Sequence, residues 1–154
     1  MDHNESVKFA NDPFDLNRFV EAQKRTYAQA LAEIRSGRKE SHWMWFIFPQ
    51  YEGLGFSATA ERYAIKSLDE TRAYLNHPTL GPRLAACVEA ALNVKGRSAR
   101  EVFGTPDDLK LRSSATLFAE VTPAGSGFER LLEKYFGGVR DEKTLKLLNA
   151  EGEG

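Results

Sequence analysis

Signals for the start of a helix recur along this chain, and they constrain its fold more than any other feature. A serine stands three residues before a glutamate, the spacing of a capping box, at these places: Ser67 and Glu70, Ser98 and Glu101, Ser126 and Glu129. Asp12-Pro13 and Thr105-Pro106 are further start signals, because proline suits the first turn of a helix. Apolar residues follow at helical spacing, which predicts a helix after each signal.

The ends of these helices are marked as well. Glycine favours the left-handed conformation that often ends a helix, and it stands where the apolar spacing stops, at Gly37, Gly96 and Gly137. One helix is expected from Pro13 to Gly37, and Asp141 is expected to cap a short last helix. No Asn-Gly or Asp-Gly hairpin signal separates alternating segments. We predict an all-α fold in one compact domain of about seven or eight helices over residues 12–149, with flexible tails at 1–11 and 150–154.

The composition is that of an ordinary globular protein. The 154 residues are 42% hydrophobic and 28% charged, enough to bury a core without a metal or a disulfide. With 21 basic and 22 acidic side chains there is no basic excess of the kind that nucleic-acid binding favours. A single cysteine, Cys87, lies on an apolar helix face and is expected to be a buried thiol in a reducing compartment. No signal-peptide pattern or membrane-length apolar run is visible, so we expect a cytoplasmic protein with no membrane partner.

The aromatic run from Trp43 to Phe48 is expected to be mostly core, because large apolar side chains are usually buried. Each buried indole N–H needs an acceptor, and Gln50 and Glu61 are the nearby candidates. The polar residues on both sides of the run, 39–42 and 50–57, are the best place to look for a site.

Two features of these polar segments are typical of a functional site. His42 adjoins the aromatic run and is the candidate for acid–base catalysis, although no partner carboxylate or thiol can be named. Gly53 and Gly55 match a loose G-x-G-x-x-A pattern, but the absence of βαβ alternation excludes a dinucleotide-binding Rossmann unit. Glycines before a helix are typical of an anion-binding site at the N-terminus of that helix. A simple turn with Ser57 as the N-cap remains the other interpretation. The histidines and Cys87 have no metal-ligand spacing, and no cofactor is predicted.

Several blocks of the sequence resemble the bacterial family filed as domain-of-unknown-function family 1810. They are FVEAQ at 19–23, GRKESHWMWFIFPQ at 37–50, GLGFSATAERYAI at 53–65, YLNHPTLGPRL at 74–84 and DDLKLRSSATLF at 107–118. The resemblance covers residues 12–149 and implies a mainly α-helical single domain. Some members carry the label calpastatin, but nothing in this sequence supports a protease inhibitor. The resemblance implies no activity, substrate or catalytic residue.

Two interpretations of function stay open. In the first, the protein binds a small anionic molecule such as a nucleotide or an ADP-ribose-like compound, and hydrolysis of such a ligand is one conceivable activity. An aromatic side chain would stack a flat group, and His42 would be the acid–base residue. The expected binding residues are Lys39, Trp43, Gln50, Gly53, Gly55 and Ser57. In the second, the protein is a non-catalytic interaction module whose aromatic patch docks an unidentified protein partner.

Overall fold

Helices account for nearly all regular structure in this computed structural model, which describes residues 12–153. There are ten of them in that range: α2 (Asn17–Gln23), α3 (Tyr27–Arg35), α4 (Met44–Ile47), α5 (Ala58–Arg62), α6 (Leu68–Asn76), α7 (Leu80–Asn93), α8 (Ala99–Phe103), α9 (Asp107–Ala119), α10 (Gly127–Phe136) and α11 (Glu142–Glu153). The one β-type pairing within residues 12–153 is an isolated parallel bridge between Tyr51 and Ile65. The all-α, single-domain prediction is therefore confirmed, with more helices than expected. The predicted tail at 1–11 lies outside the described residues.

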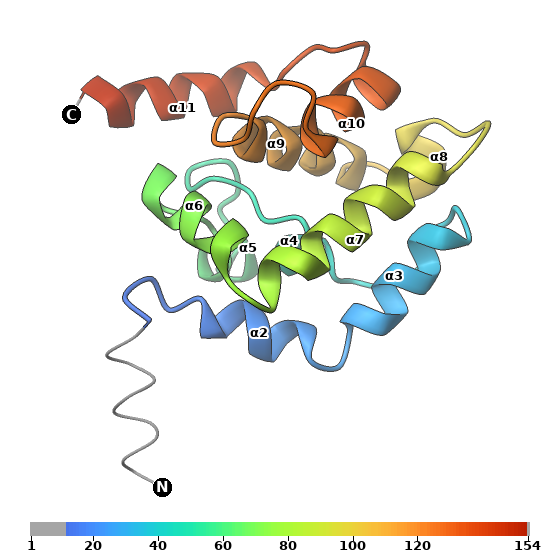
Figure 1. Cartoon of the computed structure of the whole chain (residues 1–154), viewed down its shortest axis with the longest axis horizontal. Helices are drawn as coiled ribbons and strands as arrows, with labels where there is room; N and C mark the ends of the chain where they lie inside the picture. The colour runs from blue at the N-terminus through green and yellow to red at the C-terminus, as the bar shows by residue number, and fades with distance from the viewer. Residues whose placement is uncertain (1–11, 154) are drawn as a thin grey trace, which may run out of the picture.

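The helices pack around α7. This helix contacts α3, α6 and α10, while α9 contacts α8, α10 and α11. Figure 1 shows α9, α10 and α11 together at one side of the molecule and α2 and α3 at the other, with α7 crossing between them. In the part of the chain that the structure describes, no helix is long and apolar enough to cross a membrane.

Aromatic rings from four helices connect the two sides of the core. Phe19 of α2 meets Tyr74 of α6 with their ring centroids 5.1 Å apart. Tyr74 lies 5.5 Å from Phe118 of α9, which stacks at 5.2 Å on Phe128 of α10. Such pairs add about 0.5–1.5 kcal/mol each beyond the burial of their area. This row of rings holds α9, which carries part of the site described below, against the N-terminal helices.

The serine caps form as the sequence predicts, but only one of them is a complete capping box. The hydroxyls of Ser67, Ser98 and Ser126 accept from the backbone N–H three residues on. Of these three caps, only that of α8 also has the reciprocal bond, in which the Glu101 carboxylate accepts from the Ser98 N–H at 2.8 Å. The Glu70 carboxylate is used elsewhere.

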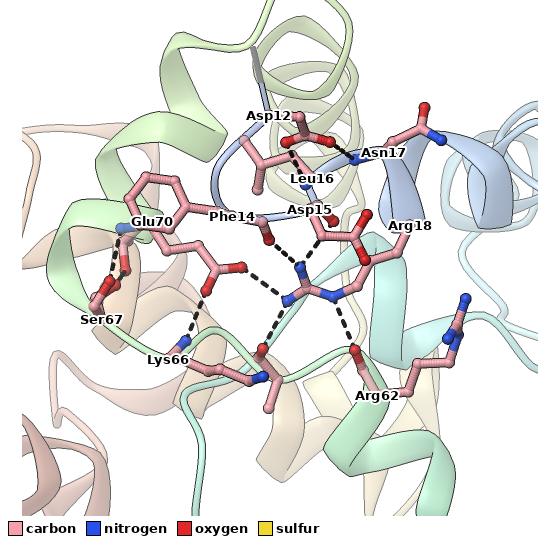
Figure 2. A network of polar contacts seen from close by, with 12 residues as sticks. Asp12, Phe14, Asp15, Leu16, Asn17, Arg18, Arg62, Lys66, Ser67 and Glu70 are labelled. Carbon is pink, nitrogen blue, oxygen red and sulfur yellow. Dashed lines mark hydrogen bonds and ion pairs between the residues drawn. The ribbon is translucent and has the colours of Figure 1, made fainter. Parts of the chain in front are cut away.

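Glu70 instead pairs with Arg18 in a buried network that joins α2 to α6 (Figure 2). Arg18 Nη2 lies 2.8 Å from Glu70 Oε2, and the two side chains are 8% and 3% exposed. The remaining Arg18 bonds go to backbone carbonyls, those of Phe14, Asp15, Arg62 and Ala64. These contacts use the full donor capacity of a guanidinium. Arg18 is thus a structural joint, with no donor left for a ligand.

The structure differs from the sequence expectations at two places along the chain. The single helix expected up to Gly37 is broken after Gln23. There the Thr26 N–H donates to the Gln23 carbonyl at 3.1 Å, and the Thr26 hydroxyl donates to the Ala22 carbonyl at 2.8 Å. At the other end, α11 continues to Glu153, into the segment 150–154 that was expected to be a flexible tail.

Candidate functional site

The aromatic run forms the short helix α4 and the residues beside it. Most of its side chains are buried, as predicted: Trp43, Met44, Ile47 and Phe48 are at most 2% exposed. Trp45 and Phe46 are half-buried. The run therefore splits into a buried face and a face that reaches toward solvent. Pro49, also buried, follows it.

Glu33 of α3, not Gln50 or Glu61, accepts the indole N–H of Trp43. The distance from Trp43 Nε1 to Glu33 Oε1 is 2.9 Å. The same carboxylate accepts from the N–H groups of Glu40 and Ser41 and from the Ser41 hydroxyl at 2.6 Å. Burial by itself raises the pKa of Glu33, but these hydrogen bonds outweigh it and lower the pKa from 4.5 to about 2. Glu33 thereby fixes the segment that leads into the aromatic run.

Lys39 and Asp107 connect this segment to the start of α9. Lys39 Nζ lies 2.8 Å from Asp107 Oδ2 and donates to the Ser41 carbonyl at 2.5 Å. It also lies 4.9 Å from the centre of the Trp43 ring. With 7% of its side chain exposed and these partners in place, Lys39 is a buried counter-ion of Asp107.

Asp107 also pairs with Lys110, and Lys110 covers Trp45. The Lys110 Nζ to Asp107 Oδ1 distance is 3.1 Å, and Nζ lies 4.6 Å from the centre of the Trp45 ring. One carboxylate is thus shared by two ammonium groups, each lying over a tryptophan. The pairing leaves one positive charge in excess. Of the two lysines, Lys110 is the more exposed, with 23% of its side chain accessible to solvent.

Trp45 and Lys110 both line a cavity of about 450 Å³ between the glycine turn, α9 and the start of α11. Its wall is made of Trp45, Gln50, Leu54, Gly55, Phe56, Ser57, Ala60, Pro106, Leu109, Lys110, Ser113, Asp141 and Lys143. The volume lies in the usual range for small-molecule sites, about 300–1,000 Å³. Apolar side chains, lysines and hydroxyls therefore converge on one concave surface.

Some polar groups of this wall already have hydrogen-bond partners within the described part of the protein, and others do not. Asp141 caps α11, with its carboxylate accepting from the Thr144 N–H at 2.9 Å, and the Ser113 hydroxyl donates to the Leu109 carbonyl at 3.1 Å. Lys143 forms no ion pair with any residue in the described range and lies 5.8 Å from the centre of the Phe56 ring. The cavity thus has two lysines against one carboxylate that is already engaged.

The glycine turn needs its two glycines, and a serine cap follows it. Gly53 has a φ of +99°, a conformation that favours glycine, and a Cβ on Gly55 would lie 2.7 Å from the Ala60 side chain. The Ser57 hydroxyl accepts from the Ala60 N–H at 3.1 Å, which makes it the N-cap of α5. These contacts agree with the simple-turn interpretation of the motif, and they also shape one wall of the cavity.

The structure brings together some of the predicted site residues. Gln50, Gly55 and Ser57 line the cavity, and Gly53 lines a small adjoining space of about 10 Å³ that shares Trp45 and Gln50. Trp43 is fully buried, so Trp45 is the tryptophan that reaches the cavity. Lys39 is buried behind Asp107. His42 is exposed and is not part of the cavity wall.

Sequence reasoning missed Trp45, Lys110 and Lys143. Trp45 belongs to the aromatic run, and nothing in the sequence distinguishes it from its buried neighbours. Lys110 lies in the charged first turn of α9, where an ion pair with Asp107 is expected, but only the fold places it over Trp45.

Two other kinds of site receive no support among residues 12–153. No group of three or more His, Cys, Asp or Glu side chains in that range could hold a metal ion. Cys87 is buried, as predicted, and burial raises the pKa of its thiol from 9.0 to about 12. A thiol with so high a pKa is a poor nucleophile near neutral pH.

Comparison with known proteins identifies the family. The family model described as "Protein of unknown function (DUF1810)" matches residues 13–148. The chain belongs to this DUF1810 family. A crystal structure of the conserved hypothetical protein Rv1873 from Mycobacterium tuberculosis is similar, with 56% sequence identity and a TM-score of 0.88 over 90% of this chain and 99% of that one. A search of curated proteins gave no match. Neither the DUF1810 description nor the name of this structural neighbour states an activity.

Proposed function

We propose that this DUF1810 protein binds a small anionic ligand, of the nucleotide or ADP-ribose class, in the cavity between the glycine turn and α9. The observation that carries the proposal is the combination of Lys110 and Lys143 with aromatic and polar side chains on one concave surface. Sites for small molecules are typically apolar clefts with a few converging polar groups.

The charges of the cavity favour an anion. Lys110 shares its carboxylate, Asp107, with the buried Lys39, so the three groups sum to one positive charge. Lys143 adds a second cation, and Asp141 is the one carboxylate in the wall. A phosphate placed near both lysines would gain charge-assisted hydrogen bonds, which are about twice as strong as neutral ones.

Hydrolysis of the bound ligand is the finer part of the proposal. Its acid–base candidate is still His42, whose exposed position outside the cavity wall requires that the ligand extend beyond the cavity to meet it. Product formation from any ligand that binds, with His42→Ala as the comparison, tests this step. A turnover rate equal to that of the wild type in His42→Ala contradicts the role of His42.

The alternative function is a non-catalytic interaction module. The exposed side chains of Phe56 and Leu109, which are 78% and 54% accessible, favour it, because they lie on one surface and exposed apolar patches mark protein-interaction sites. This alternative predicts that small anions do not stabilise the protein.

A thermal-shift screen distinguishes these functions. The panel is nucleotides, nicotinamide and ADP-ribose metabolites, sugar phosphates and small carboxylates, tested on the wild type, Lys143→Glu and Lys146→Glu. Lys146 is the matched control, since it is an exposed lysine of the same helix outside the cavity. A ligand at about 100 times its Kd adds about 2.7 kcal/mol, which raises the Tm by roughly 5–10 °C in a domain of this size.

We expect at least one anion to raise the Tm of the wild type and of Lys146→Glu, and to have little effect on Lys143→Glu. If a ligand stabilises all three proteins equally, its site is elsewhere and the proposed location is wrong. If the whole panel is without effect on folded wild-type protein, the interaction module replaces the proposal.

A further inference from the structure

Exposed large hydrophobic side chains are concentrated at the cavity. Over the described residues there are three of them, Phe56 at 78%, Leu109 at 54% and Val139 at 57% exposure. Phe56 and Leu109 both line the cavity, and Val139 does not. They come from segments far apart in the sequence, the glycine turn and the first turn of α9. The folded chain therefore brings two exposed apolar groups to one concave surface.

Each of these apolar groups has a lysine beside it. Lys143 Nζ lies 5.8 Å from the centre of the Phe56 ring, and Leu109 precedes Lys110 in α9. An apolar group next to a cation suits a ligand that has both an apolar and an anionic part. A compact anion such as a sugar phosphate would leave Phe56 and Leu109 uncovered.

Trp45 is less available than Phe56 for stacking. The Lys110 ammonium lies 4.6 Å from the centre of the Trp45 ring, where a cation is attracted by the electron-rich face, whereas Lys143 lies farther from the Phe56 ring, at 5.8 Å. Trp45 is also half-buried, whereas most of Phe56 is exposed. Trp45 thus serves to hold Lys110, and Phe56 is the aromatic surface that a ligand can reach.

We propose that Phe56 and Leu109 determine specificity by holding a flat ring of the ligand, such as a nucleobase, while Lys110 and Lys143 bind its phosphate. This inference rests on the proposed function and deepens it. It assigns the stacking role to Phe56. Trp45 instead positions Lys110, the lysine above its ring, to bind the anion.

The size of the apolar surface favours a small ligand over a protein partner. An aromatic side chain supplies about 150–250 Å² when fully buried. Two partly exposed side chains therefore fall well short of the roughly 800 Å² that each partner buries in a typical stable interface. The hollow between them, of about 450 Å³, has the size of a small molecule.

The test compares two probes that share a phosphate. AMP has a base and ribose 5-phosphate has none, and calorimetric titration measures the affinity of each for the wild type, Phe56→Ser, Leu109→Ser and Val139→Ser. Val139 is the matched control, because it is an exposed apolar side chain outside the cavity. All these positions are exposed, so folding is expected to be retained, and the Tm without ligand verifies it.

We expect AMP to bind the wild type and Val139→Ser at least about tenfold more tightly than ribose 5-phosphate, since base–aromatic stacking has effects of this size. Phe56→Ser and Leu109→Ser should each remove most of that difference and leave the affinity for ribose 5-phosphate unchanged. Equal affinities of the two probes for the wild type, or no effect of either cavity variant, would overturn the inference while the proposed anion site stands. If neither probe binds, both this inference and the nucleotide class of the proposed function are wrong.

Discussion

Glu33 holds a negative charge where little water reaches it, and it does so through four donated hydrogen bonds. Those donors come from Glu40, Ser41 and Trp43, so this one carboxylate orders the whole approach to the aromatic run. Its role is structural, because its hydrogen bonds fix the position of Trp43 and of the segment before it. The site depends on it indirectly.

Glu33→Gln should destabilise the protein by about 1.5–3 kcal/mol, because an amide cannot accept from all these donors and hydrogen bonds to a charged group have about this net value. Denaturant unfolding of the variant and of Glu40→Gln measures the loss. Glu40 is exposed and uses only its backbone N–H here, so its substitution should have almost no effect. Similar losses in both variants would contradict the role of Glu33.

The pH dependence of stability follows from the same residue. The pKa of Glu33 is about 2 in the folded protein against 4.5 for an unperturbed carboxyl, so folding favours the charged form. Its contribution is complete above about pH 5 and is lost as the pH falls toward 2. The wild type should therefore lose stability over this range more steeply than Glu33→Gln. Parallel curves for the two proteins would show that Glu33 does not titrate as described.

At this scale the sequence predicted only part of the candidate site. Gln50, Gly55 and Ser57 were found because they adjoin the aromatic run and the glycine turn. Lys143 was not, since nothing local marks one exposed lysine among many, and only the packing of α11 against α9 brings it near the turn. Site residues that come from distant segments have no pattern of their own in one sequence.

Helices were predictable where a local signal defined them. Serine caps are chemistry within a single turn, and α6, α8 and α10 begin where Ser67, Ser98 and Ser126 predicted. The break between α2 and α3 was not predicted, because no glycine or proline stands between Gln23 and Tyr27 to mark it. The second half of a capping box also depends on context, as Glu70 shows by pairing with Arg18 from a distant helix.

The joint between α2 and α6 can be tested with Glu70→Gln. Removing one partner of a buried ion pair leaves the other charge uncompensated, so we expect a loss of about 3 kcal/mol in the free energy of unfolding. Asp69→Asn in the same helix is the control, because the Asp69–Arg72 pair is exposed and such pairs contribute about 0–1 kcal/mol. Denaturant unfolding of both variants gives the comparison. A loss no greater than that of Asp69→Asn would mean that the Arg18–Glu70 pair does not stabilise the joint.

The molecule as a whole is held together by contacts between its later and earlier segments. Glu151 of α11 accepts from the Tyr51 hydroxyl at 2.7 Å and from the Leu68 N–H at 3.0 Å. These bonds tie the end of α11 to the turn region and to the start of α6. Because α11 also carries Lys143, they help to keep the cavity wall in place.

Glu151→Ala should therefore loosen α11 more than the rest of the protein. We expect a loss of about 1–2 kcal/mol from two missing hydrogen bonds, with faster amide hydrogen exchange in α11 and unchanged exchange in α7. Asn149→Ala, an exposed change in the same helix, should leave exchange nearly as in the wild type. Uniform acceleration across both helices in Glu151→Ala would instead indicate global destabilisation.

The central claim, that the cavity is a ligand site, is tested most directly by the two indole N–H signals in an NMR titration with AMP. Trp43 is buried and bonded to Glu33, while Trp45 lines the cavity, so the two tryptophans report on the core and on the site. We predict a saturable shift of the Trp45 signal with the Trp43 signal nearly unchanged. An unmoved Trp45 signal, with shifts confined to residues around His42 or absent altogether, would contradict the claim.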